Sequence, residues 1–184
     1  MLECLSEMLM AGEIKSIKLI IGGSSAIGGG ICRALHSNDH IVMTTNRRLD
    51  SASDPSTIYC DPTCYQDYLN VYDQIYRSNM LITSIYYCPG SYHIQDIGGA
   101  NHLDWISDFN LNFIGAYLSY QSLVEHLRTF KQKNPVKFIF LGSTSIISKP
   151  RGLSSYWIAK KSLEDLVSVI NNEGSSHIRA TCIR

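Results

Sequence analysis

A glycine-rich turn after the first apolar segment places the strongest constraint on how this chain can fold. Ile17–Ile21 has the composition of a β-strand, and Ile27–His36 has the spacing of a helix. Gly22–Gly28 joins them, and glycine lets the backbone turn tightly, including at φ values that other residues avoid. A strand, a tight turn and a helix form the first half of a βαβ unit. The turn therefore favours a parallel sheet.

Segments with strand composition alternate with helical segments along the rest of the chain. Further strands are predicted at Ile41–Thr45, Thr57–Cys60, Leu81–Tyr87, Val136–Leu141 and Ile178–Ile183. Further helices are predicted at Asp67–Arg77, Trp105–Lys131, with a break near Asn110, and Ser155–Ile170. Strands that are covered on both faces are apolar throughout, as these are. We predict a doubly wound α/β fold, a parallel sheet between two layers of helices, in one domain over residues 17–184 after an N-terminal extension over residues 1–16.

The composition disfavours several classes of protein. The chain has 184 residues, of which 45% are hydrophobic and 17% charged, which suits a soluble globular domain. The formal net charge is zero and the charges are dispersed, so the sequence predicts neither a nucleic-acid partner nor a membrane partner. No apolar run approaches the roughly 18 residues that span a bilayer. The N-terminal residues, with Glu3, Glu7 and Glu13, do not resemble a secretory signal.

The six cysteines do not follow the spacing of a disulfide framework. Cys60 and Cys64 form a C-x-x-x-C, but no second pair of ligands follows at zinc-like spacing. We therefore predict no metal site. Reduced, mostly buried thiols are the expectation, which favours a cytoplasmic location.

The glycine-rich turn has the sequence context of a dinucleotide-binding site. Glycines allow the backbone to approach a pyrophosphate, and the helix that follows offers unpaired N–H groups and a positive dipole end. The alternative is a turn that needs glycine only for its backbone angles. The chain lacks G-x-x-x-x-G-K-[ST], which disfavours a P-loop nucleotide hydrolase.

The residues after the second predicted strand bear on the choice between NAD and NADP. Thr44–Arg48 contains no acid, whereas a NAD-specific site usually places one there to bind the ribose 2′-hydroxyl. Arg47 is a candidate partner for the 2′-phosphate of NADP. The alternative is that Arg47 and Arg48 are solvated loop residues. We favour NADP(H) over NAD(H).

Tyr156 and Lys160 form a candidate acid/base pair. They lie four residues apart in a predicted helix, so both side chains leave the same face. A nearby cation lowers the pKa of a phenol from about 10, which suits proton transfer near neutral pH. Ser143, at the end of a predicted strand, could bond a substrate oxygen. Each has a structural alternative: a packed tyrosine, a solvated lysine and a serine that bonds the backbone.

Taken in order, these motifs resemble those of the short-chain dehydrogenase/reductase family, from about Ile17 to the last residue. The matching segments are Gly22–Gly28 for T-G-x-x-x-G-x-G, Cys60–Thr63 for the D-V-T element, Tyr87–Gly90 for N-N-A-G, Asp108–Leu111 for the segment of the catalytic-network Asn, Leu141–Thr144 for the catalytic Ser, and Tyr156 with Lys160 for Y-x-x-x-K. The order and spacing of these segments carry the resemblance.

The resemblance implies an oxidoreductase that interconverts a small-molecule carbonyl and an alcohol by hydride transfer with NAD(P)(H). Tyr156 would be the acid/base, Lys160 would lower its pKa and bind the nicotinamide ribose, and Ser143 would hold the substrate oxygen. Asn110 would connect Lys160 to solvent through water. The implied cofactor-binding residues are Gly22, Ser24, Ser25, Ile27, Gly28, Asn46, Arg47, Asp61 (against the adenine), Pro89, Gly90, Tyr156 and Lys160.

The chain departs from the family pattern in several places. Ile21 and Ala26 replace a threonine and a glycine of the first motif, and Tyr87–Cys88 replaces two asparagines. Family members continue past the strand that ends near Arg184, so we expect a sheet that lacks the family's last strand. The chain would then be either a C-terminally truncated piece of a longer protein or a naturally short variant. These departures leave open a second function, a dinucleotide-binding protein that has lost turnover and acts as a partner or sensor.

The resemblance also implies a homo-oligomer. In the family, the two long helices, here Trp105–Lys131 and Ser155–Ile170, form a dimer interface. Both carry apolar residues on more than one face, which suggests association. A serine hydrolase is disfavoured because the chain has no G-x-S-x-G motif.

Overall fold

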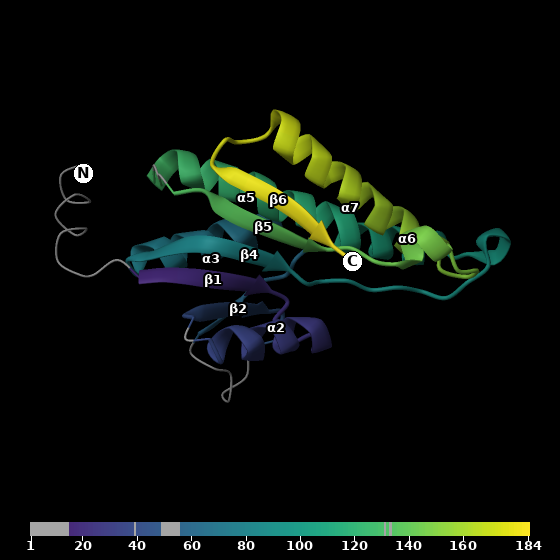
Figure 1. The fold of residues 1–184 in the computed structure, drawn as a ribbon. Helices are drawn as coiled ribbons and strands as arrows, with labels where there is room; N and C mark the ends of the chain where they lie inside the picture. Colours follow the sequence, from purple (N-terminus) through teal and green to yellow (C-terminus); the bar gives the residue numbers. More distant parts are fainter. Residues whose placement is uncertain (1–14, 39, 49–55, 131, 133) are drawn as a thin grey trace.

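The computed structural model describes residues 15–38, 40–48, 56–130, 132 and 134–184. Within these residues, six parallel strands form one sheet in the order β3-β2-β1-β4-β5-β6 (Figure 1). The strands are β1 (Lys15–Ile21), β2 (Val42–Asn46), β3 (Thr57–Tyr59), β4 (Met80–Tyr87), β5 (Val136–Leu141) and β6 (Ile178–Ile183). The chain runs outward from β1 to β3 and then returns to place β4 on the other side of β1. The predicted parallel sheet is confirmed.

The helices of the described residues are α2 (Ala26–His36), α3 (Tyr65–Arg77), α4 (His102–Phe109), α5 (Gly115–Phe130), α6 (Ser145–Ser148) and α7 (Ser154–Glu173). A 3₁₀ turn, η1 (Ile97–Gly99), precedes α4, and a π-helical turn, η2 (Asn110–Ile114), joins α4 to α5. The predicted break near Asn110 is this π-helical turn. Helix α4 begins at His102, before the predicted Trp105, because the Asn101 side chain accepts a hydrogen bond from the Leu103 N–H and caps the helix. Helix α6 was not predicted.

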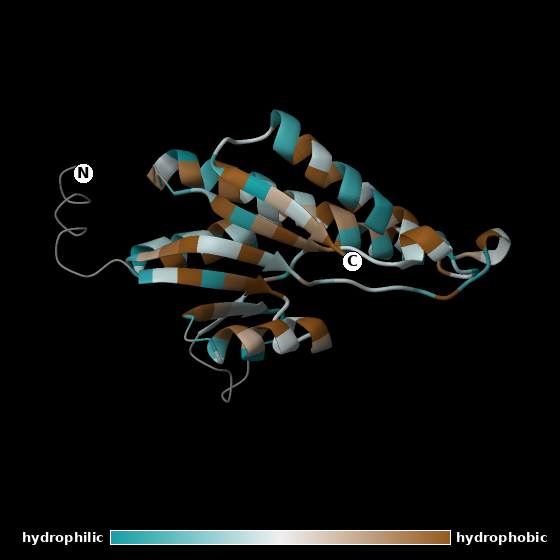
Figure 2. Ribbon diagram, in the orientation of Figure 1, coloured by the Kyte–Doolittle hydropathy of each residue, from teal (hydrophilic) through white to brown (hydrophobic). Residues whose placement is uncertain are grey.

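Helices cover both faces of the sheet, as predicted for a doubly wound fold. On β1, Ile17, Leu19 and Ile21 belong to the core cluster that α3, α5 and α7 complete. Ile20, which alternates with them, packs with Val42 under helix α2. Figure 1 accordingly shows α2 on one side of the sheet and α7 on the other. Figure 2 shows hydrophobic residues, in brown, along the strands and alternating hydrophilic and hydrophobic residues along α7.

Three further observations concern predictions about the chain as a whole. The predicted extension, residues 1–16, lies outside the described residues apart from Lys15 and Ser16, which begin β1. None of the helices that the structure describes has the length and apolar character needed to cross a membrane. Among the described residues, no cluster of three or more His, Cys, Asp or Glu side chains could hold a metal ion. The cytoplasmic location stays a prediction.

Candidate active site

The carboxyl ends of β1, β2, β4 and β5 bring most of the predicted site residues to one edge of the sheet. The strand order reverses between β1 and β4, and open α/β sheets bind their ligands in the crevice at such a point. A hollow of about 160 Å³ lies there. Seven predicted cofactor-binding residues line it: Gly22, Ser24, Ser25, Asn46, Arg47, Pro89 and Gly90. Thr45, Cys60, Pro62 and Leu111, which were not predicted, complete the lining.

The glycine-rich turn is held tightly against the end of β4. Gly22 has φ +78°, which favours glycine, and its N–H donates to Thr45 Oγ1 at 3.2 Å. A Cβ on Gly22 would lie 3.2 Å from Pro89, and a Cβ on Gly28 would lie 2.3 Å from the Gly22 carbonyl oxygen. The sequence therefore needs glycine at both positions to close the turn.

Helix α2 begins at this turn and points its positive end toward the hollow. Ser25 is the N-cap: its Oγ accepts from the Gly28 N–H at 3.0 Å and donates to the Gly22 carbonyl at 2.9 Å. The first turn of α2 contains no acidic residue, so no side chain within it competes for an anion. Ile27, predicted to bind the cofactor, is 61% exposed and does not line the hollow.

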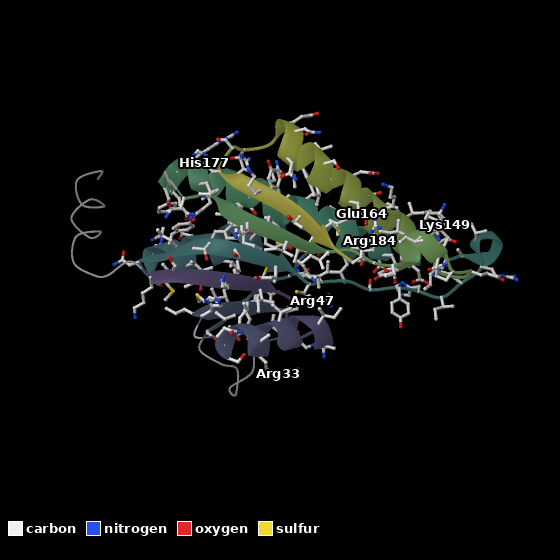
Figure 3. The ribbon with its side chains drawn as sticks, viewed as in Figure 1. Arg33, Arg47, Lys149, Glu164, His177 and Arg184 are labelled. Carbon is white, nitrogen blue, oxygen red and sulfur yellow. The ribbon has the colours of Figure 1, made fainter. Side chains whose placement is uncertain are left out.

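The end of β2 brings an amide and a guanidinium to the hollow. Asn46 Oδ1 accepts hydrogen bonds from Ser24 Oγ at 3.1 Å and from the Arg48 N–H at 3.2 Å. Figure 3 shows Arg47 near the carboxyl edge of the sheet. Burial raises the pKa of Asp61, but hydrogen bonds from Thr63 and the charge of Arg47 outweigh this effect and hold that pKa below its ordinary value. Asp61 itself does not line the hollow.

Lys160 is buried on α7, and its ammonium lies between the ends of β4 and β5. Its Nζ donates to the Leu141 carbonyl at 2.8 Å. Burial lowers the pKa of Lys160 to about 8, an effect that the nearby Cys182 and Cys88 partly oppose. A Cβ on Gly90 would lie 3.7 Å from this Nζ, so glycine keeps the space in front of the ammonium open.

Tyr156 lies on the first turns of α7, close to this ammonium. Lys160 Nζ is 5.8 Å from the centre of the Tyr156 ring. The ring of Tyr92 packs edge-on against the Tyr156 ring, with 5.9 Å between the centroids. Ser143 follows β5, and its Oγ is 2.8 Å from the Ser145 Oγ. Because Lys160 bonds Leu141, two residues before Ser143, the same lysine ties α7 to the end of β5.

Asn110 and Asn112 differ in burial and in what they contact. Asn110 is exposed in η2. Asn112 is fully buried, and its amide nitrogen donates to the Ser91 carbonyl at 2.7 Å and to the Asp108 carbonyl at 2.9 Å. Its Oδ1 would lie 2.9 Å from a Cβ on Gly90. Asn112 Oδ1 and Lys160 Nζ, at 3.7 Å from the same Cβ, therefore both lie beside Gly90.

The residues at this edge fit a dinucleotide. Asn112 Oδ1 is buried and has no hydrogen-bond partner among the described residues, so it is an acceptor that faces the open space beside Gly90. The glycine-rich turn, the positive end of α2 and Arg47 supply close backbone approach and positive charge, which suit phosphate groups.

Comparison with known proteins identifies the fold. No protein-family model and no curated protein matches the sequence. Similar solved structures include a short-chain dehydrogenase from Streptomyces avermitilis, with a TM-score of 0.78 at 19% identity over 93% of this chain and 65% of that one. They also include the ligand-free aldohexose dehydrogenase of Thermoplasma acidophilum, with a TM-score of 0.79 at 17% identity over 92% of this chain and 66% of that one. A serine dehydrogenase from Escherichia coli has a TM-score of 0.75 at 18% identity over 91% of this chain and 81% of that one.

The chain thus spans only 65% and 66% of the length of the first two of these proteins. At 17–19% identity, the similarity lies in the three-dimensional arrangement of the elements rather than in the sequence. The fold of this chain is that of the short-chain dehydrogenases, whose motifs its sequence resembles.

Proposed function

We propose that the chain is an NAD(P)(H)-dependent oxidoreductase that interconverts a carbonyl and an alcohol. The observation that carries this proposal is the buried ammonium of Lys160, 5.8 Å from the Tyr156 ring, at the strand edge that also carries the glycine-rich turn. A packed tyrosine and a solvated lysine, the alternatives for these residues, do not explain why the lysine is buried.

In this proposal each residue of the site has one task. The nicotinamide, when bound, supplies or accepts the hydride. Tyr156 gives its hydroxyl proton to the carbonyl oxygen in reduction and takes it back in oxidation, and the ammonium of Lys160 stabilises the phenolate. Ser143 donates a hydrogen bond that orients the substrate oxygen. Asn112, in place of Asn110, offers its unpaired oxygen beside Lys160.

The cofactor residues divide between phosphate and ribose. The turn at Gly22, with Ser24 and Ser25 at the start of α2, is suited to the pyrophosphate. Asn46 stands where an acid would bind the 2′-hydroxyl of NAD, and Arg47 follows it. This pairing of a neutral side chain with a cation supports NADP(H) over NAD(H).

Arg47→Ala is expected to weaken NADPH binding by about 10- to 100-fold and to leave NADH binding nearly unchanged, because only NADPH carries the 2′-phosphate that a guanidinium can bond. Dissociation constants from fluorescence titrations of both cofactors give the ratio. Arg48→Ala is the matched control, since Arg48 is also exposed but does not line the hollow. An equal loss of affinity for the two cofactors would retire the assignment of Arg47 to the 2′-phosphate.

A dinucleotide-binding protein without turnover is the second candidate function. The observation that favours it is that Tyr87 and Cys88 stand where the resemblance expects two asparagines. Tyr87 instead bonds the Leu111 carbonyl through its hydroxyl at 2.7 Å and so fixes β4 to η2. Cofactor binding without reduction of any carbonyl would distinguish this function from the first.

We infer that the chain associates with itself through α4 and α5. Of the apolar residues that the helices carry, Leu123 and Leu163 are buried in the core and are not available to a partner. Four large side chains along α4, η2 and α5 are instead exposed: Leu103, Ile106, Ile114 and Tyr117. An exposed apolar patch of this kind is typical of an interface.

Ile106→Asp is expected to convert an oligomer into a monomer, because it places a charge within this patch. Sedimentation velocity measures the mass directly, and the monomer mass is 20.6 kDa. Ile41→Asp provides the control variant, since Ile41 is also exposed but lies just before β2, outside both long helices. A monomeric wild-type chain would contradict the inference.

A further inference from the structure

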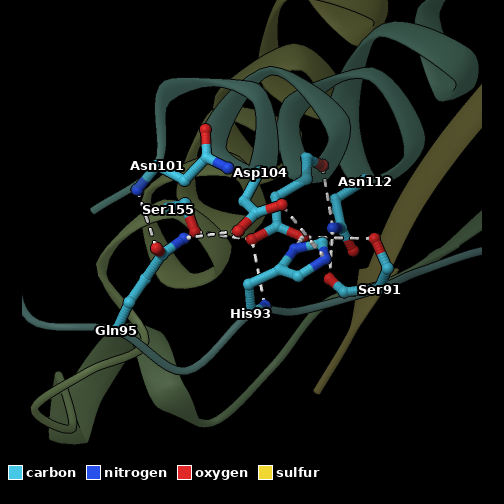
Figure 4. A network of polar contacts seen from close by, with 8 residues as sticks. Ser91, His93, Gln95, Asn101, Asp104, Asn112 and Ser155 are labelled. Atoms are coloured by element: carbon cyan, nitrogen blue, oxygen red, sulfur yellow. Dashed lines mark hydrogen bonds and ion pairs between the residues drawn. The ribbon is translucent and has the colours of Figure 1, made fainter. Parts of the chain in front are cut away.

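Asp108, on α4, is a fully buried carboxylate outside the proposed catalytic set. Its Oδ1 accepts from Ser91 Oγ at 3.2 Å and contacts His93 Nδ1 at 3.0 Å. Its Oδ2 accepts from the His93 backbone N–H at 3.2 Å and from Ser155 Oγ at 2.6 Å. Figure 4 shows Ser91, His93 and Ser155 converging in this network. Since an ionised carboxylate only accepts hydrogen bonds, the arrangement assigns the His93 proton to Nδ1.

The number of donors explains how the protein can bury this charge. An isolated carboxylate is costly to remove from water, and the cost falls only when hydrogen bonds satisfy its oxygens. Helix α7 contributes as well. It begins with no side-chain cap and no acidic residue in its first turn, and Asp108 brings a negative charge to that end through Ser155. Hydrogen-bond partners therefore satisfy both oxygens of Asp108.

The partners of Asp108 flank the two tyrosines that pack together. Ser155 directly precedes Tyr156, and Ser91 and His93 stand on either side of Tyr92. Tyr92 is 60% exposed, so packing in the core does not hold its ring in place. The Asp108 carboxylate thus bonds both backbone segments that carry Tyr92 and Tyr156, whose rings pack against each other.

We propose that Asp108 is a positioning residue for Tyr156. By bonding Ser155 on one side and Ser91 and His93 on the other, it sets the distance between the first turn of α7 and the segment after β4. Asn112 reinforces the same connection through its bond to the Ser91 carbonyl. The effect on turnover rests on the proposed function, whereas the effect on the position of the Tyr156 ring does not.

Asp104 offers a matched control for Asp108. It faces the same histidine, with 3.7 Å between Asp104 Oδ1 and His93 Nε2, and accepts a long bond of 3.4 Å from Gln95. Its side chain is 36% exposed, whereas that of Asp108 is buried. If charge near His93 were all that mattered, the two acids would be equivalent.

The test compares the contact between the two rings in wild type, Asp108→Asn, Ser155→Ala and Asp104→Asn. The full chain is labelled with ¹³C-tyrosine, and Tyr92→Phe and Tyr156→Phe assign the two signals. We expect a nuclear Overhauser effect between the rings in wild type and in Asp104→Asn. We expect its loss in both Asp108→Asn and Ser155→Ala. Asp108→Asn replaces one of the two acceptor oxygens with an NH₂ group that faces other donors, and Ser155→Ala removes the hydroxyl that ties the first turn of α7 to Asp108.

Retention of the ring contact in both Asp108→Asn and Ser155→Ala would overturn the proposal, and so would its loss in Asp104→Asn. Circular dichroism establishes that each variant is folded. If Asp108→Asn does not fold, Ser155→Ala and His93→Ala decide the question, because each leaves the carboxylate with most of its other donors.

Turnover supplies an independent second readout. Asp108→Asn should lower kcat by about 100-fold without changing the KM for NADPH, and should have no further effect in a Tyr156→Phe background. An equal loss in both backgrounds would mean that Asp108 does not act through Tyr156. Absence of turnover in wild type would reject the proposed function alone, and the ring contact would then decide the positioning role.

Discussion

Replacing Tyr156 with phenylalanine is expected to slow carbonyl reduction by about 10²- to 10⁴-fold, the usual contribution of a general acid, while NADPH binding persists. The substitution removes only the hydroxyl group. The ring can keep its contact with Tyr92 and its place near the Lys160 ammonium, so the site loses its proton donor and little else. The oxidation of NADPH, followed at a single turnover with a panel of aldehydes and ketones, measures the effect.

The control for this experiment is a tyrosine far from the proposed chemistry. Tyr59, on β3, is half exposed, and its replacement by phenylalanine should leave the rate unchanged. Equal rates for wild type and Tyr156→Phe would show that Tyr156 is not the acid. A loss of NADPH binding together with activity would instead indicate that the tyrosine holds the cofactor rather than transferring a proton.

Replacing Lys160 with methionine is expected to abolish activity and, at the same time, to remove a buried charge that lowers the free energy of unfolding. The buried ammonium has a pKa of about 8 against 10.5 for an ordinary lysine, so burial disfavours its charged form. At neutral pH the folded protein therefore carries a charge that costs about 3 kcal/mol. Methionine fills similar space without a charge, although it leaves the Leu141 carbonyl without this donor.

The pH dependence of stability separates the cost of the buried Lys160 charge from the loss of its hydrogen bond to the Leu141 carbonyl. The folded state releases the Lys160 proton near pH 8 and the unfolded state near 10.5, so the unfolded state binds more protons between these values. The free energy of unfolding of wild type should therefore rise with pH across this window, by about 3 kcal/mol relative to Lys160→Met. Groups with altered pKa values that Lys160 does not influence, such as Tyr72 and Cys60, titrate alike in both proteins and cancel in the difference.

Urea unfolding of both proteins across this pH window gives the difference in the free energy of unfolding. Lys161→Met is the matched control, because the ammonium of Lys161 is exposed and paired with Asp165 on the helix surface. The difference in the free energy of unfolding between wild type and Lys161→Met should not change between pH 8 and 10. A difference between wild type and Lys160→Met that does not change with pH would mean that Lys160 is not a buried charge.

The fold was predictable because its signals are local and repeated. Each strand is an apolar run between turns, and each helix repeats its apolar residues at helical spacing, as in α3, where Tyr68, Tyr72 and Ile75 are buried together. The glycine-rich turn could be placed because Gly22 and Gly28 have no room for a side chain. Helix α6 was missed because its four residues are too short to repeat a pattern.

The asparagine proposed for the catalytic network shows where the sequence was insufficient. Asn110 and Asn112 stand two residues apart, and only one of them can face the sheet. The spacing of a regular α-helix does not reveal which one, because the π-helical turn η2 adds a residue to the turn at this point. The sequence carried one signal: Asp108, Asn112 and Ala116 lie four residues apart, whereas Asn110 falls outside this spacing. The structure shows that all three of these residues are buried. The role of Asp108 was not predictable, because its partners Ser91 and Ser155 come from distant parts of the chain.

The most direct test of the account is a titration of NADPH with the chain, followed by the fluorescence of the reduced nicotinamide. We expect a saturable change, weakened by Arg47→Ala and retained in Tyr156→Phe, because the hollow at the ends of β1, β2 and β4 is proposed to bind the dinucleotide before any proton is transferred. The absence of any response to both NADPH and NADH would contradict the account.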